Sequence, residues 1–373
     1  MFLPRRLLSP ATSPSIRTFA TSLPARTSVS ALDACNELKH RFGGNKAAPI
    51  SSRTQRLDAN QLHLLSLTLG RQRLHRPPST FSSTSTSTES EPPKIGTSLP
   101  PAYHLAYFTP PFLEQDLGPD GSDKSVNPLR PWTRRMWAGG EIHWSNDKDK
   151  DGRRWGLRIG DLVREVTRLR SAEVKRAREG GEMLVVGVEK EYFVGGGEGR
   201  GMDGEGTPVV RDRREWVFRR EVDGSEGQGS AQAYKIPLQE PLPEGPITRD
   251  FIQTPVSLFR FSALTFNAHK IHYSRDWCRA VEGHRDCVVH GPLNLINILD
   301  LWRDKVRGGR EGVLPVTIKY RAKSPLYVGE KYRILLTESE GGGVGDRGNG
   351  WEAEIVDSYG RVAMVGSIEE GGD

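Results

Sequence analysis

Apolar residues between Gly291 and Val306 recur with the period of an α-helix. They form one core-facing stripe, made of Leu295, Leu299, Trp302 and Val306. Pro292 suits the first turn of a helix, and the pair Gly308-Gly309 would end it. Because Ile298 and Leu301 widen the stripe, we expect the core to surround this helix on several sides.

Strands are predicted on both sides of this helix. After it, alternating apolar and polar residues predict three or four strands, over residues 316–323, 332–338, 351–358 and 361–368. Before it, segments rich in Val, Tyr, Phe and Trp predict strands over residues 134–144, 159–169, 183–194 and 208–222. An earlier helix is expected from Asp58 to Gly70, since Asp58 can cap its first turn. Helices segregated from an antiparallel sheet indicate an α+β fold.

Two polar segments divide the chain into two domains. Residues 77–93 are almost all Ser, Thr, Pro and Glu, which predicts a disordered insertion. Residues 223–250 begin with a stretch rich in Gly, Ser, Glu and Pro, which predicts a linker. The expected organisation is therefore a presequence (1–30), a linker (31–54), an N-terminal domain (55–222), the second linker, and a C-terminal domain (251–370).

The first thirty residues have the composition of a mitochondrial presequence. They contain several arginines and many Ser and Thr, and no acidic residue precedes Asp33. We expect the protein in the mitochondrial matrix, with cleavage between Arg17 and Ser30. An ordinary basic tail would have the same composition.

The charge pattern argues against nucleic-acid binding. The net charge is +6 and the pI is about 9.2, but basic and acidic residues are interleaved along the chain. In the densest cluster, Arg211–Arg220, this alternation favours a solvated strand face. The chain contains no run of about eighteen apolar residues, so no membrane span is predicted. The three cysteines are odd in number and lack metal-ligand spacing, so we expect no disulfide framework, no metal and no other cofactor.

Candidate chemistry is concentrated in two neighbouring segments, Phe261–Tyr273 and Val288–Leu293. They contain His269, His272 and His290, together with Asn267 and the Gly291-Pro292 helix start. A histidine in apolar surroundings can exchange protons near neutral pH, and free amides at a helix start can stabilise an oxyanion. The combination indicates an acid/base site for an acyl substrate.

These segments resemble the MaoC-like hydratases and dehydratases. The match includes Leu99–Phe108, Arg134–Gly139, the Phe-Asn-Ala-His-Lys-Ile-His-Tyr run that ends at Tyr273, and Val288–Leu293. It covers roughly residues 55 to 370, and the branch of mitochondrial 3-hydroxyacyl-thioester dehydratase type 2 and mesaconyl-CoA hydratase is the most similar. The resemblance implies a double hot-dog fold, in which an antiparallel sheet wraps around a central helix in each half and the C-terminal half carries the chemistry.

The resemblance also implies roles for three residues. The family motif has Asp and His five residues apart, and the matching positions are Asn267 and His272. A carboxamide cannot accept a proton from carbon, so His272 must carry most of the proton transfer and Asn267 would position the substrate hydroxyl. The amide of Gly291 is the expected oxyanion donor, while His269 and His290 are not expected to be essential. Asp276 is a candidate to hold His272 in place of the missing acid.

The implied substrate is an acyl thioester of acyl carrier protein or coenzyme A, and the implied reaction is reversible loss of water from a (3R)-hydroxyacyl group in mitochondrial fatty-acid synthesis. Candidate contacts to acidic carrier or coenzyme groups are Arg275, Arg279, Lys319, Arg321 and Lys323. Two alternatives stay open: a hydratase of short branched or dicarboxylic enoyl-CoA, and a non-catalytic acyl-binding protein. An arginine pocket would favour the dicarboxylic substrate, and an apolar tunnel the fatty acyl chain. The sequence also leaves a homo-oligomer open.

Overall fold

The computed structural model describes residues 29–43, 48–75, 91–148, 154–177, 180–195, 206–221, 239–339 and 350–371. The strands are β1 (Ser51–Arg56), β2 (Arg134–Trp144), β3 (Leu162–Arg176), β4 (Glu182–Val194), β5 (Val210–Arg219), β6 (Ile247–Ile252), β7 (Thr317–Ala322), β8 (Lys331–Glu338), β9 (Gly350–Asp357) and β10 (Val362–Glu369). The helices are α1 (Ala31–Gly43), α2 (Ala59–Thr68), α3 (Pro255–Leu264), α4 (Arg275–Trp277) and α5 (Gly291–Lys305). Short helical turns are η1 (Tyr103–Ala106), η2 (Glu114–Asp116), η3 (Lys270–His272) and η4 (Cys278–Glu282). Almost all of the expected presequence, most of the insertion expected at 77–93 and much of the second linker lie outside the described residues.

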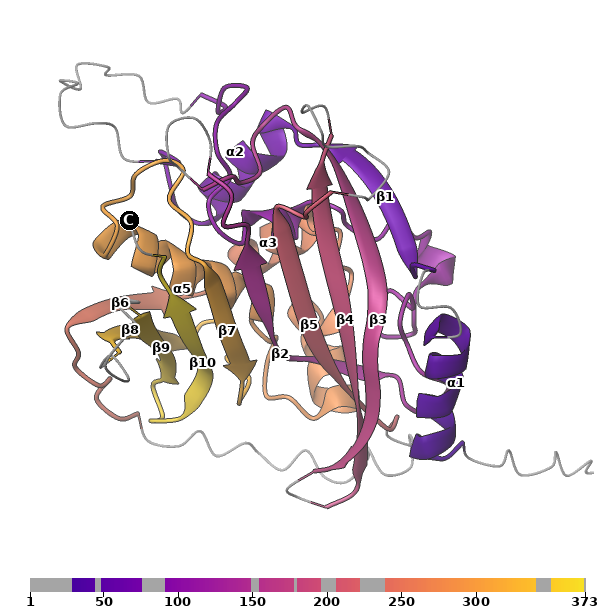
Figure 1. Cartoon of the computed structure of the whole chain (residues 1–373). Helices are drawn as coiled ribbons and strands as arrows, with labels where there is room; N and C mark the ends of the chain where they lie inside the picture. The colour runs from indigo at the N-terminus through magenta and orange to yellow at the C-terminus, as the bar shows by residue number, and fades with distance from the viewer. Residues whose placement is uncertain are drawn as a thin grey trace, which may run out of the picture.

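The described strands form one ten-stranded antiparallel sheet, in the order β1-β3-β4-β5-β2-β7-β10-β9-β8-β6. The two halves of the sheet repeat one strand order. Counted inward from one edge it is β1-β3-β4-β5-β2, and counted inward from the other edge it is β6-β8-β9-β10-β7. The two halves meet where β2 pairs with β7, from Gly139 opposite Arg321 to His143 opposite Thr317. The helices lie mainly behind the sheet in the view of Figure 1. This arrangement is the double hot-dog fold that the resemblance implied.

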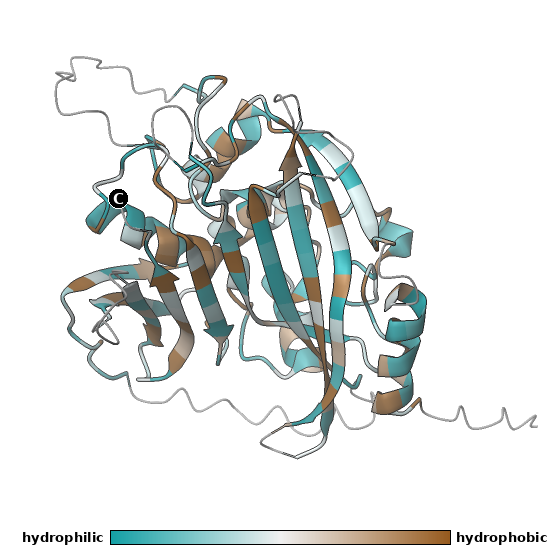
Figure 2. Cartoon of the chain, viewed as in Figure 1, coloured by the Kyte–Doolittle hydropathy of each residue, from teal (hydrophilic) through white to brown (hydrophobic). Residues whose placement is uncertain are grey.

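The C-terminal half is built around α5, as predicted. The stripe residues Leu295, Leu299 and Trp302 are at most 1% exposed, and Ile298 and Leu301 are fully buried. The strands alternate between hydrophobic and hydrophilic bands (Figure 2), and their inner residues pack with α5 in one core. The predicted helix start at Gly291 and all four predicted strands of this half are confirmed.

The N-terminal half has a different inner layer. Helix α1 packs on β3 and β4, where Ala34 and Leu38 meet Leu184 and Phe218 in a separate small cluster. Among its described residues, no helix of this half matches the fifteen residues of α5. The inner face of its sheet is packed at its other end as well, where Val163, Tyr192 and Val210 belong to the main core, and the middle of that face borders a cavity.

Several elements were absent from the sequence prediction. Helix α1 and strand β1 lie in the segment expected as a linker, and β6 begins at Ile247, before the expected end of the second linker. Helix α3 follows a capping box formed by Thr254 and Ser257, with Pro255 in its first turn. The predicted cap of α2 is present, because the carboxylate of Asp58 accepts a hydrogen bond from the amide of Gln61 at 2.8 Å. None of the described helices has the length and apolar character needed to cross a bilayer.

Candidate active site

A cavity of about 1390 Å³ lies between the two halves and contains all three of the predicted site residues. Asn267 and His272 come from the loop and turn that follow α3, and Gly291 begins α5. A turn of the N-terminal half supports this loop: the amide of Lys270 donates to the carbonyl of Asp120 at 2.7 Å. Gly121 allows the close approach, since its φ is +80° and a Cβ there would lie 2.0 Å from the carbonyl oxygen of Ala268.

His272 is 8% exposed and has a defined tautomer. Its Nδ1 lies 2.8 Å from the carbonyl oxygen of Val288. A carbonyl can only accept, so Nδ1 carries the proton and Nε2 keeps a lone pair. Burial lowers the pKa of His272 to about 4, and the positive charge of Arg135 adds to this effect. The side chain is therefore a neutral base at physiological pH, oriented by Val288 and not by Asp276, which is exposed.

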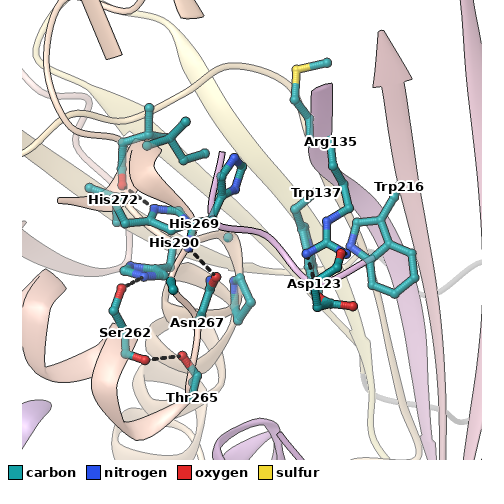
Figure 3. Close-up of a pocket in the computed structure, with 18 of the residues that line it drawn as sticks. Asp123, Arg135, Trp137, Trp216, Ser262, Thr265, Asn267, His269, His272 and His290 are labelled. Atoms are coloured by element: carbon teal, nitrogen blue, oxygen red, sulfur yellow. Dashed lines mark hydrogen bonds and ion pairs between the residues drawn. The ribbon is translucent and has the colours of Figure 1, made fainter. Parts of the chain in front are cut away.

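Three imidazoles gather around this position (Figure 3). The ring of His290 stacks on His272 with 3.6 Å between centroids, and its Nε2 lies 2.9 Å from the hydroxyl of Ser262. His269 lies edge-on to His272, and its Nε2 is 3.3 Å from a carboxylate oxygen of Asp120. Burial lowers the pKa of both neighbours well below the ordinary value, so the cluster favours uncharged rings. Within the described residues, no group of His, Cys, Asp and Glu is arranged to hold a metal ion.

Asn267 is half-buried, and the oxygen of its side-chain amide already has a hydrogen-bond donor. Its Oδ1 accepts a hydrogen bond from the backbone amide of His269 at 3.1 Å. The Nδ2 hydrogens are the part of the side chain that remains to contact a substrate oxygen. Phe266, just before it, has a left-handed φ of 47° and turns the chain toward the cavity wall.

Gly291 has a steric role that sequence reasoning did not find. A Cβ at this position would lie 2.9 Å from two ring atoms of Trp137, a residue of β2. An indole of the N-terminal half therefore occupies the space beside the start of α5. The amides of a first helical turn have no acceptor within the helix, so the amide of Gly291 remains a candidate donor.

The opposite wall comes from the N-terminal half and was not predicted. Arg135 donates to a carboxylate oxygen of Asp123 at 2.8 Å, beside the indole of Trp216 (Figure 3). Lys190 of β4 and Arg214 of β5 also line the cavity. The interpretation of Arg211–Arg220 as a solvated face is wrong for its inward residues, because Asp212 is fully buried and Arg214 is only 14% exposed. Outward residues such as Arg211 and Arg213 do form a solvated ladder with Glu189.

The cations proposed for carrier or coenzyme contacts separate into two groups. Arg321 and Lys323 are exposed, line the cavity and make no ion pair within the part of the chain that is described. Arg275 and Arg279 instead lie near the carboxylate of Asp286, and Lys319 near that of Glu141. Only Arg321 and Lys323 therefore border the candidate site.

Comparisons with known proteins agree with the fold and the motifs. The chain is 29% identical over 282 residues to mesaconyl-C(4)-CoA hydratase of Chloroflexus aurantiacus, which covers 75% of this chain and 86% of the relative. It is 24% identical over 260 residues to the mitochondrial hydroxyacyl-thioester dehydratase type 2 of Schizosaccharomyces pombe, covering 65% of this chain and 79% of the relative. The crystal structure of a MaoC-like dehydratase from Phytophthora capsici has a TM-score of 0.54 and 14% identity, and the match covers 87% of this chain and 97% of that one. This last likeness shows the fold.

The family itself is identified by a match that spans most of both halves. The sequence model described as hydroxyacyl-thioester dehydratase type 2 matches residues 102–328, which include β2 to β5, the histidine cluster, α5 and β7. The named relatives are hydro-lyases, which add water to a double bond or remove it. The chain belongs to the hydroxyacyl-thioester dehydratase type 2 family of enzymes.

Proposed function

We propose that the protein catalyses reversible loss of water from a (3R)-hydroxyacyl thioester, with His272 as the acid/base group. The observation that carries the proposal is the neutral, buried imidazole of His272. Its Nδ1 proton is held by Val288, and it shares one cavity with Asn267 and Gly291. A positioned base of this kind contributes about a hundred- to ten-thousandfold to a rate.

In the dehydration direction, Nε2 of His272 removes the α-proton and the electron pair of that C–H bond forms the new double bond. The bond from the β-carbon to the hydroxyl breaks, and the imidazolium or a water beside it protonates the departing oxygen, so water is released. The Nδ2 group of Asn267 donates to the substrate hydroxyl, because its Oδ1 already accepts from His269. The amide of Gly291 stabilises the enolate-like thioester oxygen.

Arg321 and Lys323 contact the phosphates of coenzyme A or of the carrier-protein arm in this proposal. Both are exposed cations at the border of the cavity and make no ion pair with other described residues, as the phosphate end of such a substrate requires. The pathway is mitochondrial fatty-acid synthesis, which the Schizosaccharomyces pombe relative and the basic N-terminal segment support. The Chloroflexus aurantiacus relative supports a short enoyl-CoA substrate as the second candidate.

The decisive experiment compares wild type with His272→Ala in hydration of crotonyl-CoA and of the same acyl group on carrier protein. We expect kcat/KM to fall by about a hundredfold or more in the variant. His143→Ala is the matched control, since His143 lies beside Glu141 on the other face of the sheet and outside the cavity. Unchanged turnover in His272→Ala would refute the mechanism, and no turnover of either substrate by wild type would favour an acyl-binding protein.

The mitochondrial location has its own test. A reporter protein fused to residues 1–30 should accumulate in the matrix and lose the segment on import. A reporter that stays in the cytosol at full length would contradict the presequence.

A further inference from the structure

The inner face of the N-terminal half bears a cluster of charged side chains, which we name the ionic cluster. It consists of Arg53, Glu165, Lys190, Asp212 and Arg214. Lys190 and Asp212 face each other across β4 and β5, and Arg214 follows two residues after Asp212, so all three share one face of the sheet. Glu165, Lys190 and Arg214 line the cavity. A charged inner face is unusual, since this is the side on which a sheet normally packs its core.

The cluster holds more cations than carboxylates. Glu165 accepts hydrogen bonds from Arg53 at 3.0 Å and from Lys190 at 3.1 Å. Asp212 accepts one from the Nε of Arg214 at 2.8 Å and lies 3.3 Å from His104. Three cations therefore surround two carboxylates, an excess of one positive charge even with His104 neutral. Burial, together with the neighbouring arginines, lowers the pKa of Lys190, while the carboxylate of Glu165 opposes this change.

The ionic cluster lies close to the reacting end of the cavity. The guanidinium of Arg214 lies 5.6 Å from the ring centroid of Trp137. The same indole ring packs against the backbone of Gly291, where α5 begins. One indole therefore separates Arg214 of the ionic cluster from the proposed oxyanion donor.

A purely structural role explains the cluster less well. Ion pairs taken out of water rarely stabilise a fold more than apolar residues of similar size would. The equivalent face of the C-terminal half has apolar residues, among them Ile334, Leu336 and Ile355, all fully buried. Moreover, an excess charge facing a cavity gains most when a ligand of opposite sign binds there.

We propose that the ionic cluster is a specificity subsite for an anionic group at the far end of a short acyl chain, with Lys190 and Arg214 as the residues that bind it. The ligand class is an enoyl or 3-hydroxyacyl thioester whose acyl group ends in a carboxylate. The proposal rests on the hydro-lyase chemistry proposed above and favours its second candidate substrate, a short enoyl-CoA, over an intermediate of fatty-acid synthesis. It concerns residues of the other half. A carboxylate balances the excess charge and gains charge-assisted hydrogen bonds from the two side chains.

The test measures kcat/KM for hydration of glutaconyl-CoA, which ends in a carboxylate, and of trans-hexenoyl-CoA, an uncharged substrate of similar length. We expect wild type to prefer glutaconyl-CoA by about tenfold or more, the size of one charged hydrogen bond. Arg214→Gln should abolish most of this preference while hexenoyl-CoA hydration persists. Arg213→Gln is the matched control. Arg213 immediately precedes Arg214 in β5, lies on the outer face of the sheet and pairs with Glu189.

Arg214→Gln leaves Asp212 with fewer partners and could fold poorly, so Lys190→Gln provides a second variant; Glu165 keeps Arg53 in that protein. Loss of the preference in a folded Lys190→Gln enzyme supports the proposal equally. Equal turnover of the two substrates by wild type, or a preference for hexenoyl-CoA, overturns the subsite and leaves the His272 chemistry intact. Failure of both substrates and of crotonyl-CoA in wild type refutes the proposed function itself.

Discussion

The two halves of the molecule share one strand order but differ in what their inner faces contact. In the C-terminal half, α5 lies against fully buried residues such as Ile334 and Ile355. In the N-terminal half, Lys190 and Arg214 of the inner face border the cavity instead. The same sheet therefore packs against a central helix in one half and borders the cavity with charged residues in the other.

The difference teaches that the strand order does not decide the role of a sheet face. An apolar face needs a cover, and α5 supplies it with a stripe that is wholly buried. A charged face gains little from such a cover, because packing cannot satisfy its polar atoms. The histidine cluster lies beside the start of α5 and shares the cavity with Lys190 and Arg214, so the candidate chemistry lies where the two kinds of surface meet.

The largest effect on stability is expected in the C-terminal half, which is built around α5. Leu299→Ala removes a fully buried side chain from the middle of α5 and should lower the free energy of unfolding by about 2–5 kcal/mol. Urea denaturation followed by circular dichroism measures the change. Leu64→Ala on α2 is the matched control, since Leu64 is 42% exposed and its truncation should cost far less. Equal losses in the two variants would remove the basis for treating α5 as the core of its half.

Acid should weaken the fold through the histidine cluster. The pKa of His272 is lowered from 6.5 to about 4 by burial, so the unfolded chain binds a proton that the folded protein excludes. Stability from this group is complete above pH 6.5 and is lost as the pH falls toward about 4, by roughly 3 kcal/mol in all. His269 and His290 act in the same direction, and Arg135 and His284 also disfavour the charged ring.

Urea denaturation of wild type and His272→Gln between pH 7 and 5 tests this expectation, and the variant should lose less stability on acidification. His143→Gln, outside the cavity, is the control and should follow wild type. The same low pKa predicts that activity persists well below pH 6.5 in the folded enzyme. An activity that halves near pH 6.5 would show that His272 is not the base in its buried, neutral form.

The smallest effect on stability is expected in the ionic cluster. Lys190→Met replaces a charged wall residue by an apolar side chain of similar length, while Arg53 continues to pair with Glu165. We expect the free energy of unfolding to change by no more than about 1 kcal/mol, because Glu165 keeps a cationic partner and is not left as an unpaired buried charge. Urea denaturation measures it beside Leu299→Ala. A loss as large as that of Leu299→Ala would assign the cluster to the core and weaken the contrast between the halves.

Most of the sheet and the central helix could be predicted from periodicity. The apolar stripe of α5 and the alternation in β7 to β10 are strong signals because one face is buried and the other is not. Strand β1 gave no such signal, since Ser51–Arg56 is polar throughout and its pairing with β3 depends on the backbone. Helix α1 was missed because its buried face consists of small residues, Ala31, Ala34 and Cys35, with a single leucine.

The candidate site was predicted only in its C-terminal part. His272, Asn267 and Gly291 lie close together in the chain, so a local motif identified them. Trp137, Lys190 and Arg214 reach the same cavity from strands far away in the sequence, and no local pattern reports such proximity. A partial signal did exist: Asp212 and Arg214 are two residues apart, which places them on the same side of a strand. Whether that side faces solvent or the interior depends on the tertiary fold.

The pairing of β2 with β7 joins the strands of the two halves into a single sheet. β2 contributes Trp137 to one wall and is hydrogen-bonded along its length to the strand that carries Arg214. A hinge at this junction would have to break ladder hydrogen bonds, so opening and closing of the halves is disfavoured. The pairing therefore disfavours any change in the width of the cavity through movement of one half relative to the other.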